Sequence, residues 1–385
     1  MKWMHIADLH IGKTHEAAEL ERDQKAVLDE IIEKVREEKP DGMFIAGDVY
    51  DRSMPSETAV VMFDRFLTEL SSLCPVYMIS GNHDSGGRLS FAGNLLSKQN
   101  VFVSGGYTGE IYPIVQGDTD IYLLPYVHAE DIKKALRDRG CSKADEITDT
   151  DSAVRAAIGS CKPGNGKYRV LIAHLFVTNG GKEPLSSDSE TKHIRRDPVG
   201  GLDSVDVSAF EGFDYVALGH IHAPQCAGRE TVRYAGTPMM YSFSEEHQIK
   251  SISVFEPESD TPVRTIPLTA GRRMRIVRGL LNDLLTPGFD PLPHDDIVLA
   301  ELTDTTEQPG ALARLRNVYP TVQIKPVGIV LDEASESENI DARFDDPLLL
   351  IEEFFRKRRQ GMEMTDAERA EISALLDEAD KGVTA

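Results

Sequence analysis

Short apolar runs alternate with longer amphipathic stretches over the first 255 residues. The runs at 3–7, 42–46 and 76–80 are largely apolar, as in strands of a sheet that is covered on both faces. Residues 17–38 and 56–73 repeat apolar side chains at helical spacing. Further strands are expected at 121–126, 169–173, 215–218, 232–235 and 250–255. This alternation predicts a layered α/β sandwich.

Two stretches are polar and predict irregular structure. One spans 139–167 and contains the turn sequence Gly164-Asn165-Gly166. The other spans 178–212 and is rich in Gly, Ser and Asp. A loop of that length inside a compact domain is usually functional or disordered.

The pattern changes after about residue 270. A small α+β domain is expected there, with strands at 274–277, 297–302 and 322–326 and a helix at 309–318. An acidic linker follows at 332–346, and two short amphipathic helices begin at Asp346 and at Thr365. We therefore expect three parts, namely 1–270, 271–332 and 333–385.

The two C-terminal helices each present an apolar stripe that a short helix beyond a linker cannot bury alone. Either they pack on each other and on the body of the chain, or they dock on helices of a partner. The first stripe contains Leu348, Leu349, Ile351, Phe354 and Phe355, and the second contains Ile372, Leu375, Leu376 and Ala379.

Composition predicts a cytoplasmic globular protein. The chain has 385 residues and is 41% hydrophobic, and it has no apolar run of the roughly 20 residues that a membrane helix needs. Residues 1–10 lead directly into a polar motif and leave no room for a signal peptide. The four cysteines are scattered and include no CxxC pair, so reduced thiols are expected.

The net charge of −22 opposes strong DNA binding by this chain alone, because nonspecific duplex binding depends on Lys and Arg. A basic partner would help. Arg195, Arg196 and the cluster at 272–278 are candidate phosphate contacts, although solvated surface charge is the other explanation for them.

Polar donor residues occur in five short groups, each after a predicted strand. In open α/β sheets, ligand sites form where strands end and loops converge. Carboxylate, amide and imidazole donors suit an ion such as Mn²⁺. Seven donors, one of them shared, would fill most of two octahedra. The candidate metal ligands are Asp8, His10, Asp48, Asn82, His174, His220 and His222.

The spacing of the donors suggests how they divide between two ions. Asp48 follows Gly47 at a strand end and is the candidate bridge. Asp8 and His10, two residues apart on an extended segment, would serve one ion with His222. The other ion would take Asn82, His174 and His220. A single DxH or GHxH motif is uninformative, so the prediction depends on all five groups in this order.

Three further residues are candidates for catalysis. His83 adjoins Asn82 and is expected to face the substrate, where it would protonate the leaving oxygen or stabilise charge. Asp84 is expected to hydrogen-bond the His83 ring. Asp51 would orient a ligand histidine or accept a proton, or else serve only as a turn residue.

The five groups resemble the motifs of the calcineurin-like metallophosphoesterase superfamily. Within it, the chain resembles the SbcD family of bacterial nuclease subunits, which are relatives of double-strand-break repair nucleases. The supporting segments are HIADLHIGK, IAGDVYDR, ISGNHDSGGRL, YVALGHIHAPQ and RYAGTPMMYSFSEEHQIKS, together with Ser189-Glu190 and Gly200-Gly201 before His220.

The resemblance implies a Mn²⁺-dependent double-strand exonuclease and single-strand endonuclease with two metal ions, Mg²⁺ being the other possible metal. It also implies a capping domain, a homodimer within a heterotetramer, and an SbcC-type coiled-coil ATPase partner. That partner would be gripped by Leu348, Leu349, Phe354, Phe355, Ile372, Leu375 and Leu376. Two alternatives are a phosphatase or small-molecule phosphodiesterase and a non-catalytic scaffold, which substrate preference and activity with Mn²⁺ would separate.

Overall fold

The computed structural model describes residues 1–16, 18–190, 204–328, 364–365, 368–369 and 372–373. The chain divides into two units, one comprising Met1–Thr303 with Gln308–Pro326 and the other comprising Asp304–Glu307 with Val327–Ala385. The predicted helix after Asp346 and the arginines 195 and 196 lie outside the described residues.

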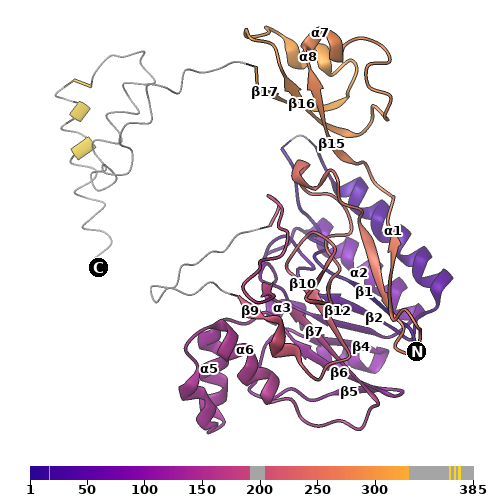
Figure 1. Cartoon of the computed structure of the whole chain (residues 1–385), viewed down its shortest axis with the longest axis vertical. Coiled ribbons are helices and arrows are strands. Elements are labelled where there is room, and N and C mark those ends of the chain that lie inside the picture. The colour runs from indigo at the N-terminus through magenta and orange to yellow at the C-terminus, as the bar shows by residue number, and fades with distance from the viewer. Residues whose placement is uncertain (17, 191–203, 329–363, 366–367, 370–371, 374–385) are drawn as a thin grey trace. The chain divides into compact units, whose positions relative to one another are not determined.

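Two six-stranded sheets form the centre of the first unit (Figure 1). The first sheet has the order β14 (Val263–Pro267), β13 (Ser251–Phe255), β1 (Trp3–Ile6), β2 (Gly42–Ala46), β3 (Val76–Ile79) and β4 (Val101–Ser104). The second has the order β11 (Gln225–Ala227), β12 (Arg229–Tyr234), β10 (Tyr215–Gly219), β7 (Tyr168–His174), β6 (Thr119–Leu124) and β5 (Ile114–Gln116). Strands β1 to β4 are parallel, as are β6, β7, β10 and β12.

The two sheets pack face to face through one apolar layer. Trp3 and Phe44 of the first sheet stack with ring centroids 5.1 Å apart, and they share a core cluster with Ile172 and Tyr215 of the second. Polar contacts also join the two sheets: His5 Nδ1 lies 3.1 Å from the Tyr215 hydroxyl, and Arg233 Nε donates to Ser253 Oγ over 3.2 Å. Interdigitated side chains between aligned sheets are the usual core of such sandwiches.

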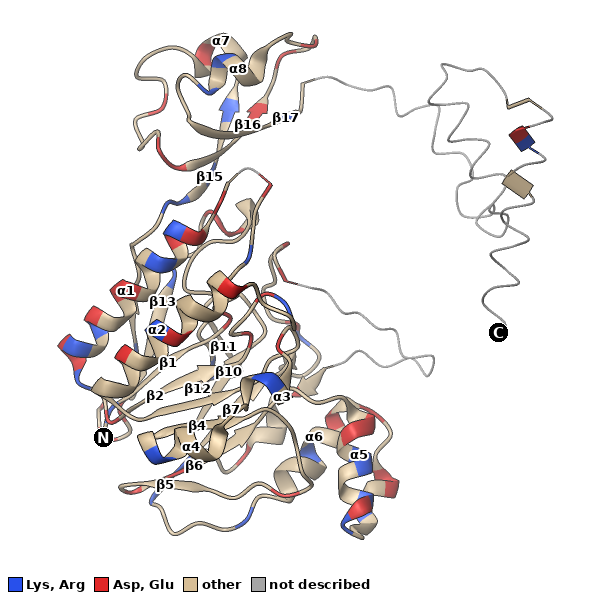
Figure 2. Ribbon diagram, turned by 180° about the vertical axis from the view of Figure 1, so that it is seen from behind, with Lys and Arg blue, Asp and Glu red and all other residues tan. Residues whose placement is uncertain are grey.

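Helices cover the outer faces of both sheets. On the first sheet, α1 (Glu21–Glu38) and α2 (Glu57–Leu73) bury apolar faces against strands β1 and β2. On the second sheet, α5 (Ala129–Asp138) and α6 (Thr150–Gly159) bury their apolar faces in a core cluster with strands β7 and β10. Acidic and basic residues alternate along the rest of α1 (Figure 2). The layers are therefore helix, sheet, sheet, helix, and the predicted α/β sandwich is confirmed.

The segment 139–167 was wrongly predicted to be irregular, because α6 occupies its centre. The Asp149 side chain accepts a hydrogen bond from the Ser152 backbone, and this cap begins the helix. Its buried face consists of the small residues Ala153, Val154 and Ala157. Such side chains give a weak periodic signal within a polar segment, which is why the pattern missed the helix.

The residues after 273 form a separate three-stranded parallel sheet, with the helices α7 (Leu281–Leu284) and α8 (Ala311–Leu315). Its strands are β15 (Met274–Gly279), β16 (Ile297–Leu302) and β17 (Thr321–Pro326). Val277, Val298 and Leu315 belong to its own core cluster. These elements lie within the range in which a capping domain is expected.

The remaining described elements are short. They include the helices α3 (Gly86–Leu89) and α4 (Gly93–Leu96), the strands β8 (Val177–Thr178) and β9 (Val205–Asp206), and single turns of 3-10 helix. In the second unit, Thr365 and Glu368 form the expected reciprocal capping box, with Thr365 N donating to Glu368 over 2.9 Å. Among the described residues, no helix has the length and apolarity that crossing a membrane requires.

Candidate metal centre

The predicted donors meet where the carboxyl ends of strands from both sheets converge. Asp8 and His10 follow β1, Asp48 follows β2, and Asn82 follows β3. His174 ends β7, and His220 follows β10. The parallel direction of these strands puts all of their carboxyl ends at one edge of each sheet. The structure thus brings together side chains that are more than 200 positions apart in the chain, as with His10 and His222.

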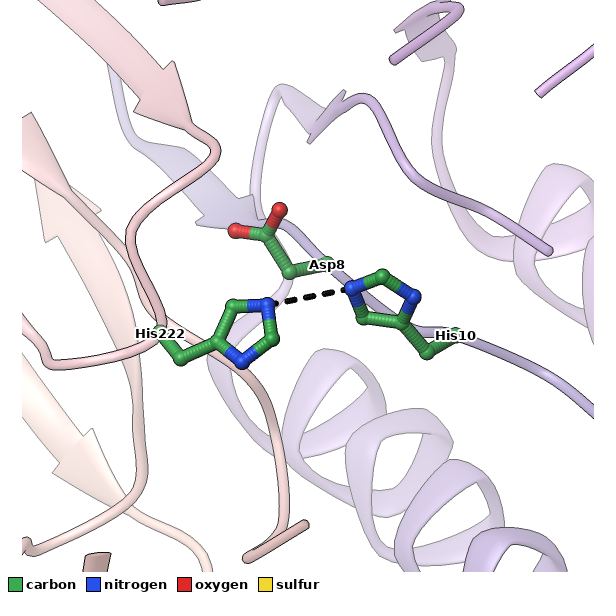
Figure 3. Close-up of side chains that lie close together, drawn as sticks. All are labelled: Asp8, His10 and His222. Atoms are coloured by element: carbon green, nitrogen blue, oxygen red, sulfur yellow. Dashed lines mark hydrogen bonds between the residues drawn. The ribbon is translucent and has the colours of Figure 1, made fainter. Parts of the chain in front are cut away.

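Asp8, His10 and His222 form one half of the centre (Figure 3). The Nε2 atoms of His10 and His222 lie 3.1 Å apart. Asp8 Oδ2 is buried and has no hydrogen-bond partner among the described residues. A buried carboxylate oxygen without a partner is costly in a protein interior, and a cation bound beside it would compensate that cost.

Asn82, His174 and His220 form the other half. Asn82 Oδ1 lies 2.9 Å from His174 Nε2 and 3.0 Å from His220 Nδ1. The opposite ring nitrogen of His174, Nδ1, lies 2.9 Å from the Ala46 carbonyl oxygen. Donation to that carbonyl would place the proton on Nδ1 and leave Nε2 as a ligand atom.

Asp48 lies between the two halves. Its Oδ2 atom is 3.7 Å from His10 Nε2 and 3.4 Å from His174 Nε2. Its Oδ1 atom accepts a hydrogen bond of 2.8 Å from the His83 backbone. Asp48 was predicted to be the bridging carboxylate, and its side chain lies between the donors of the two halves.

The donor set fits divalent cations. Neighbouring ligands of an octahedral ion bound at about 2.1 Å are separated by about 3 Å, and the closest donor pairs lie 2.9 to 3.1 Å apart. The mixture of carboxylate, amide and imidazole groups also suits a Mn²⁺-like ion. By this test, Asp8, His10, Asp48, Asn82, His174, His220 and His222 can hold metal.

Electrostatics point the same way. Burial raises the pKa of Asp8 well above its usual range. Burial lowers the pKa of His174, but the Asp48 and Asp8 carboxylates outweigh burial and raise that pKa to about 9. A protonated imidazole would then neutralise buried carboxylates when no cation is bound. Metal binding requires the neutral imidazole and so releases that proton.

Four of the donors have an uncommon backbone conformation. The φ angles of Asp8, His10, Asp48 and His220 are 52°, 43°, 46° and 98°. A positive φ disfavours residues other than glycine, and such strain concentrates at functional sites. Packing of both sheets around these loops holds the four residues in this conformation, which directs their side chains inward.

Two motif glycines allow the loops to approach one another. Gly47 has a φ of 84°, and a Cβ atom there would lie 2.4 Å from His174 Nδ1. At Gly81, a Cβ atom would lie 2.1 Å from Asp48 Oδ1. Any larger residue would push a donor side chain away from its position.

His83 and its neighbours differ partly from expectation. The ring Nδ1 of His83 lies 2.8 Å from the Asp51 carbonyl oxygen. The Asp84 carboxylate, expected at that ring, instead accepts hydrogen bonds from the backbones of Val49, Tyr50 and Gly81, at 2.9 to 3.1 Å. These bonds join the loops after β2 and β3, so Asp84 shapes the turn that places His83.

Asp51 lies beside His10, in agreement with the expectation that it could orient a ligand histidine. Its Oδ1 atom lies 3.5 Å from His10 Nδ1 and accepts a hydrogen bond of 3.0 Å from Lys13 Nζ. Burial opposes ionisation of Asp51, but His10 and Lys13 outweigh burial and lower its pKa. Lys13 was not identified from the sequence, because a single lysine carries no pattern.

Two of the arginines considered as phosphate contacts have other partners. Arg275 is 3% exposed and forms ion pairs with Asp290 and Asp296, at 2.6 and 2.7 Å. Arg272 pairs with Asp23 of α1 at 2.7 Å. Neither of the two explanations offered from sequence describes these side chains, since their partners come from other elements of the fold.

Comparison with known proteins agrees with this geometry. Residues 1–224 match the calcineurin-like phosphoesterase family, a span that includes every donor of the centre. The chain is also 27% identical, over 380 residues, to a protein of Staphylococcus epidermidis (strain ATCC 12228 / FDA PCI 1200) that is named as a component of the nuclease SbcCD. That similarity covers 97% of this chain and 96% of the relative. The chain therefore belongs to the calcineurin-like phosphoesterase family and is a metal-dependent phosphoesterase.

Proposed function

We propose that the chain is a Mn²⁺-dependent DNA nuclease that works as part of a larger complex and hydrolyses phosphodiester bonds with two metal ions. Double-strand exonuclease and single-strand endonuclease activity are the proposed reactions, in DNA repair and recombination in the cytoplasm. The observation that carries the proposal is the complete donor set in a chain similar over 97% of its length to a protein named as part of a nuclease.

The seven donors would hold the metal. When bound, two ions supply an activated water and neutralise charge on the phosphate oxygens. Asp48, whose carboxylate faces both halves of the centre, is assigned to contact both ions. A scaffold without catalysis would not need this buried cluster of partly unpaired donors.

His83 is assigned to the leaving oxygen. Its backbone amide bonds Asp48, and its ring Nδ1 faces the Asp51 carbonyl. If Nδ1–H donates to that carbonyl, the ring is held in one orientation with Nε2 on its other side. From there a protonated ring would transfer a proton to the departing sugar oxygen.

The partner and the DNA contacts belong to the same proposal. The C-terminal residues Leu348, Leu349, Phe354, Phe355, Ile372, Leu375 and Leu376 are proposed to bind the coiled coil of an SbcC-type ATPase. The relative's name, which identifies it as one component of SbcCD, supports that choice. The net charge of −22 supports a partner that supplies DNA affinity. A homodimer within the complex is part of the proposal.

The direct test is to incubate the purified chain with Mn²⁺ and an end-labelled linear duplex. Cleavage that stops when the metal is chelated supports the nuclease. A chromogenic phosphodiester in a parallel reaction tests the other candidate, a small-molecule phosphodiesterase. If the chain hydrolyses the small ester but not DNA, even with a basic ATPase partner added, the DNA assignment fails.

Arg195 and Arg196 are proposed to contact DNA phosphates. Reversing both charges should weaken duplex binding in a gel-shift assay and reduce its salt dependence by about one unit of slope per lost contact. Hydrolysis of the small ester is the control and should not change. Unchanged DNA binding would remove these two residues from the proposed substrate site.

A further inference from the structure

A buried ion pair lies beside the metal centre and has no role in the site described so far. Glu245 is 0% exposed and Lys250 is 5% exposed. Glu245 Oε2 and Lys250 Nζ lie 2.6 Å apart. Both residues belong to the segment RYAGTPMMYSFSEEHQIKS, for which the donor set gives no function.

Stability alone does not explain a buried ion pair of this kind. Removing two charges from water usually costs about as much as their attraction returns, so a buried pair is weak evidence for a stabilising role. One of the other hydrogen bonds of Lys250, which also donates to Gln248 Oε1 over 2.7 Å, reaches the backbone of a candidate ligand. Lys250 Nζ donates to the His222 carbonyl over 3.0 Å and to Thr237 Oγ1 over 2.7 Å.

The carboxylate reaches the same histidine through a serine. The Ser189 hydroxyl donates to Glu245 Oε1. Its oxygen lies 2.5 Å from His222 Nδ1. If the hydroxyl proton is given to Glu245, the Ser189 oxygen is left as an acceptor toward the ring, and Nδ1 would carry the hydrogen.

The backbone of His222 is held as well. Its amide donates to Glu190 Oε1 over 2.8 Å, and its carbonyl accepts from Lys250. The amide of His222 therefore contacts Glu190, its carbonyl contacts Lys250, and its ring is connected to Glu245 through Ser189. We call Ser189, Glu190, Glu245 and Lys250 the His222 support.

We infer that the His222 support holds His222 in its Nδ1–H tautomer and presents Nε2 to the half of the metal centre that it shares with Asp8 and His10. The inference deepens the proposed function, since it rests on the proposed role of His222 as a ligand. Ligand histidines commonly donate their second ring nitrogen to a carboxylate or a carbonyl. Here a serine connects the ring to the carboxylate.

Ser189→Ala tests the connection, because it removes the hydroxyl while leaving the ion pair intact. Ser187→Ala is the matched control. The Ser187 hydroxyl is buried and lies 3.4 Å from Glu245 Oε1 and 2.9 Å from the Ser189 oxygen, whereas the ring of His222 is bonded by Ser189. We expect Ser189→Ala to weaken one of two bound Mn²⁺ ions by about 10- to 100-fold in calorimetry. Ser187→Ala should remain within about threefold of wild type, and Ser189→Thr should restore affinity.

A structural role alone would change folding instead. Metal-free Ser189→Ala and Ser187→Ala should unfold at similar temperatures, so a difference in metal affinity would not follow from stability. Equal Mn²⁺ affinities for the two variants would overturn the inference. His222→Gln distinguishes a failure of the ligand assignment from a failure of the His222 support. If it keeps both ions, the ligand assignment itself fails; if it loses one while Ser189→Ala loses none, only the His222 support fails.

The tautomer can be observed without metal or activity. Nitrogen-15 NMR of the full chain, labelled at histidine and assigned with His222→Gln, distinguishes Nδ1–H from Nε2–H. Wild type should show Nδ1–H at His222, and Ser189→Ala should shift this signal toward a tautomer mixture. An Nε2–H signal in the wild type would contradict the proposed direction of the hydrogen bonds.

Discussion

The two sheets contribute different chemistry to one centre. The loops of the first sheet supply both carboxylates, the amide and the His10 imidazole, whereas the second sheet supplies only imidazoles. The first-sheet carboxylates are held by backbone amides, as Asp48 is by His83 and Asp8 is by His220. The second-sheet histidines are oriented by acceptors, namely the Ala46 carbonyl for His174 and Ser189 for His222.

The charge of the centre therefore comes from the first sheet, whereas the contribution of the second sheet depends on how its imidazole rings are oriented. The first sheet supplies the negative charge that attracts a dication, and its amide contacts keep that charge in place. A neutral imidazole brings no charge, so its value as a ligand depends on which nitrogen is protonated and where the ring points. Damage to the first-sheet carboxylates should therefore remove metal, whereas damage to the second-sheet imidazoles should mainly loosen it.

Asp48→Asn should give the largest effect, because it removes the charge that faces both halves. We expect Mn²⁺ affinity to fall by more than about a hundredfold, since loss of a ligand's partner alone costs 10- to 100-fold. Cleavage of DNA or of a small phosphodiester should be lost with it. Calorimetry checks the metal, and Asp64→Asn on the exposed side of α2 is the control. Normal Mn²⁺ binding would contradict the bridging role.

His83→Ala should separate catalysis from metal binding among the first-sheet loops. The rate of cleavage should fall by about 10²- to 10⁴-fold, as for loss of a general acid. Both Mn²⁺ ions should remain. The imidazole of His83 could itself hold metal, because its ligand atom lies within 4.8 Å of ligand atoms of His10 and Asp48. Loss of one ion in calorimetry would therefore assign His83 to the ligands and end its proposed separate role.

Gly47→Ala changes a loop of the first sheet, but it should displace His174 of the second sheet. The new Cβ atom would meet His174 Nδ1, and a φ of 84° disfavours alanine. We expect a loss of about 10- to 100-fold in affinity for one ion, with the other retained. Gly87→Ala, where a Cβ atom meets nothing within 4 Å, is the control. Equal metal binding by the two variants would mean that His174 tolerates displacement.

The smallest effect on metal binding is expected at His5, which joins the two sheets and is not among the metal donors. Burial, with a secondary contribution from Arg233, lowers the pKa of His5 from 6.5 to about 3. The folded state thus keeps the ring neutral, and its contribution to stability is complete above pH 6.5. That contribution is lost as the pH falls from 6.5 toward 3, because the unfolded chain binds the proton.

Urea unfolding of metal-free protein between pH 7 and pH 4 measures this effect. His5→Phe keeps a ring in the layer between the sheets but cannot titrate. Its free energy of unfolding should therefore decline less steeply with acid than that of the wild type. Identical slopes for the two proteins would show that His5 is not a source of the acid sensitivity.

Local sequence determined much of the fold and of the donor set. Short, largely apolar runs predicted the strands at 3–7 and 42–46, and helical spacing of apolar residues predicted α2. The donors were readable because each follows a strand, and strand ends in parallel sheets meet at one edge. These signals depend on a few consecutive residues.

Only the tertiary structure decided which partner each polar side chain has. Asp84 bonds amides 35 and 34 positions away, and Arg275 pairs with aspartates outside β15. Ser189 and Glu245 could be noticed in the sequence but not connected to His222. Periodicity specifies which face of an element is apolar, whereas hydrogen bonds need donor and acceptor within about 3 Å. Packing of two sheets sets that distance, and it is not encoded in any one segment.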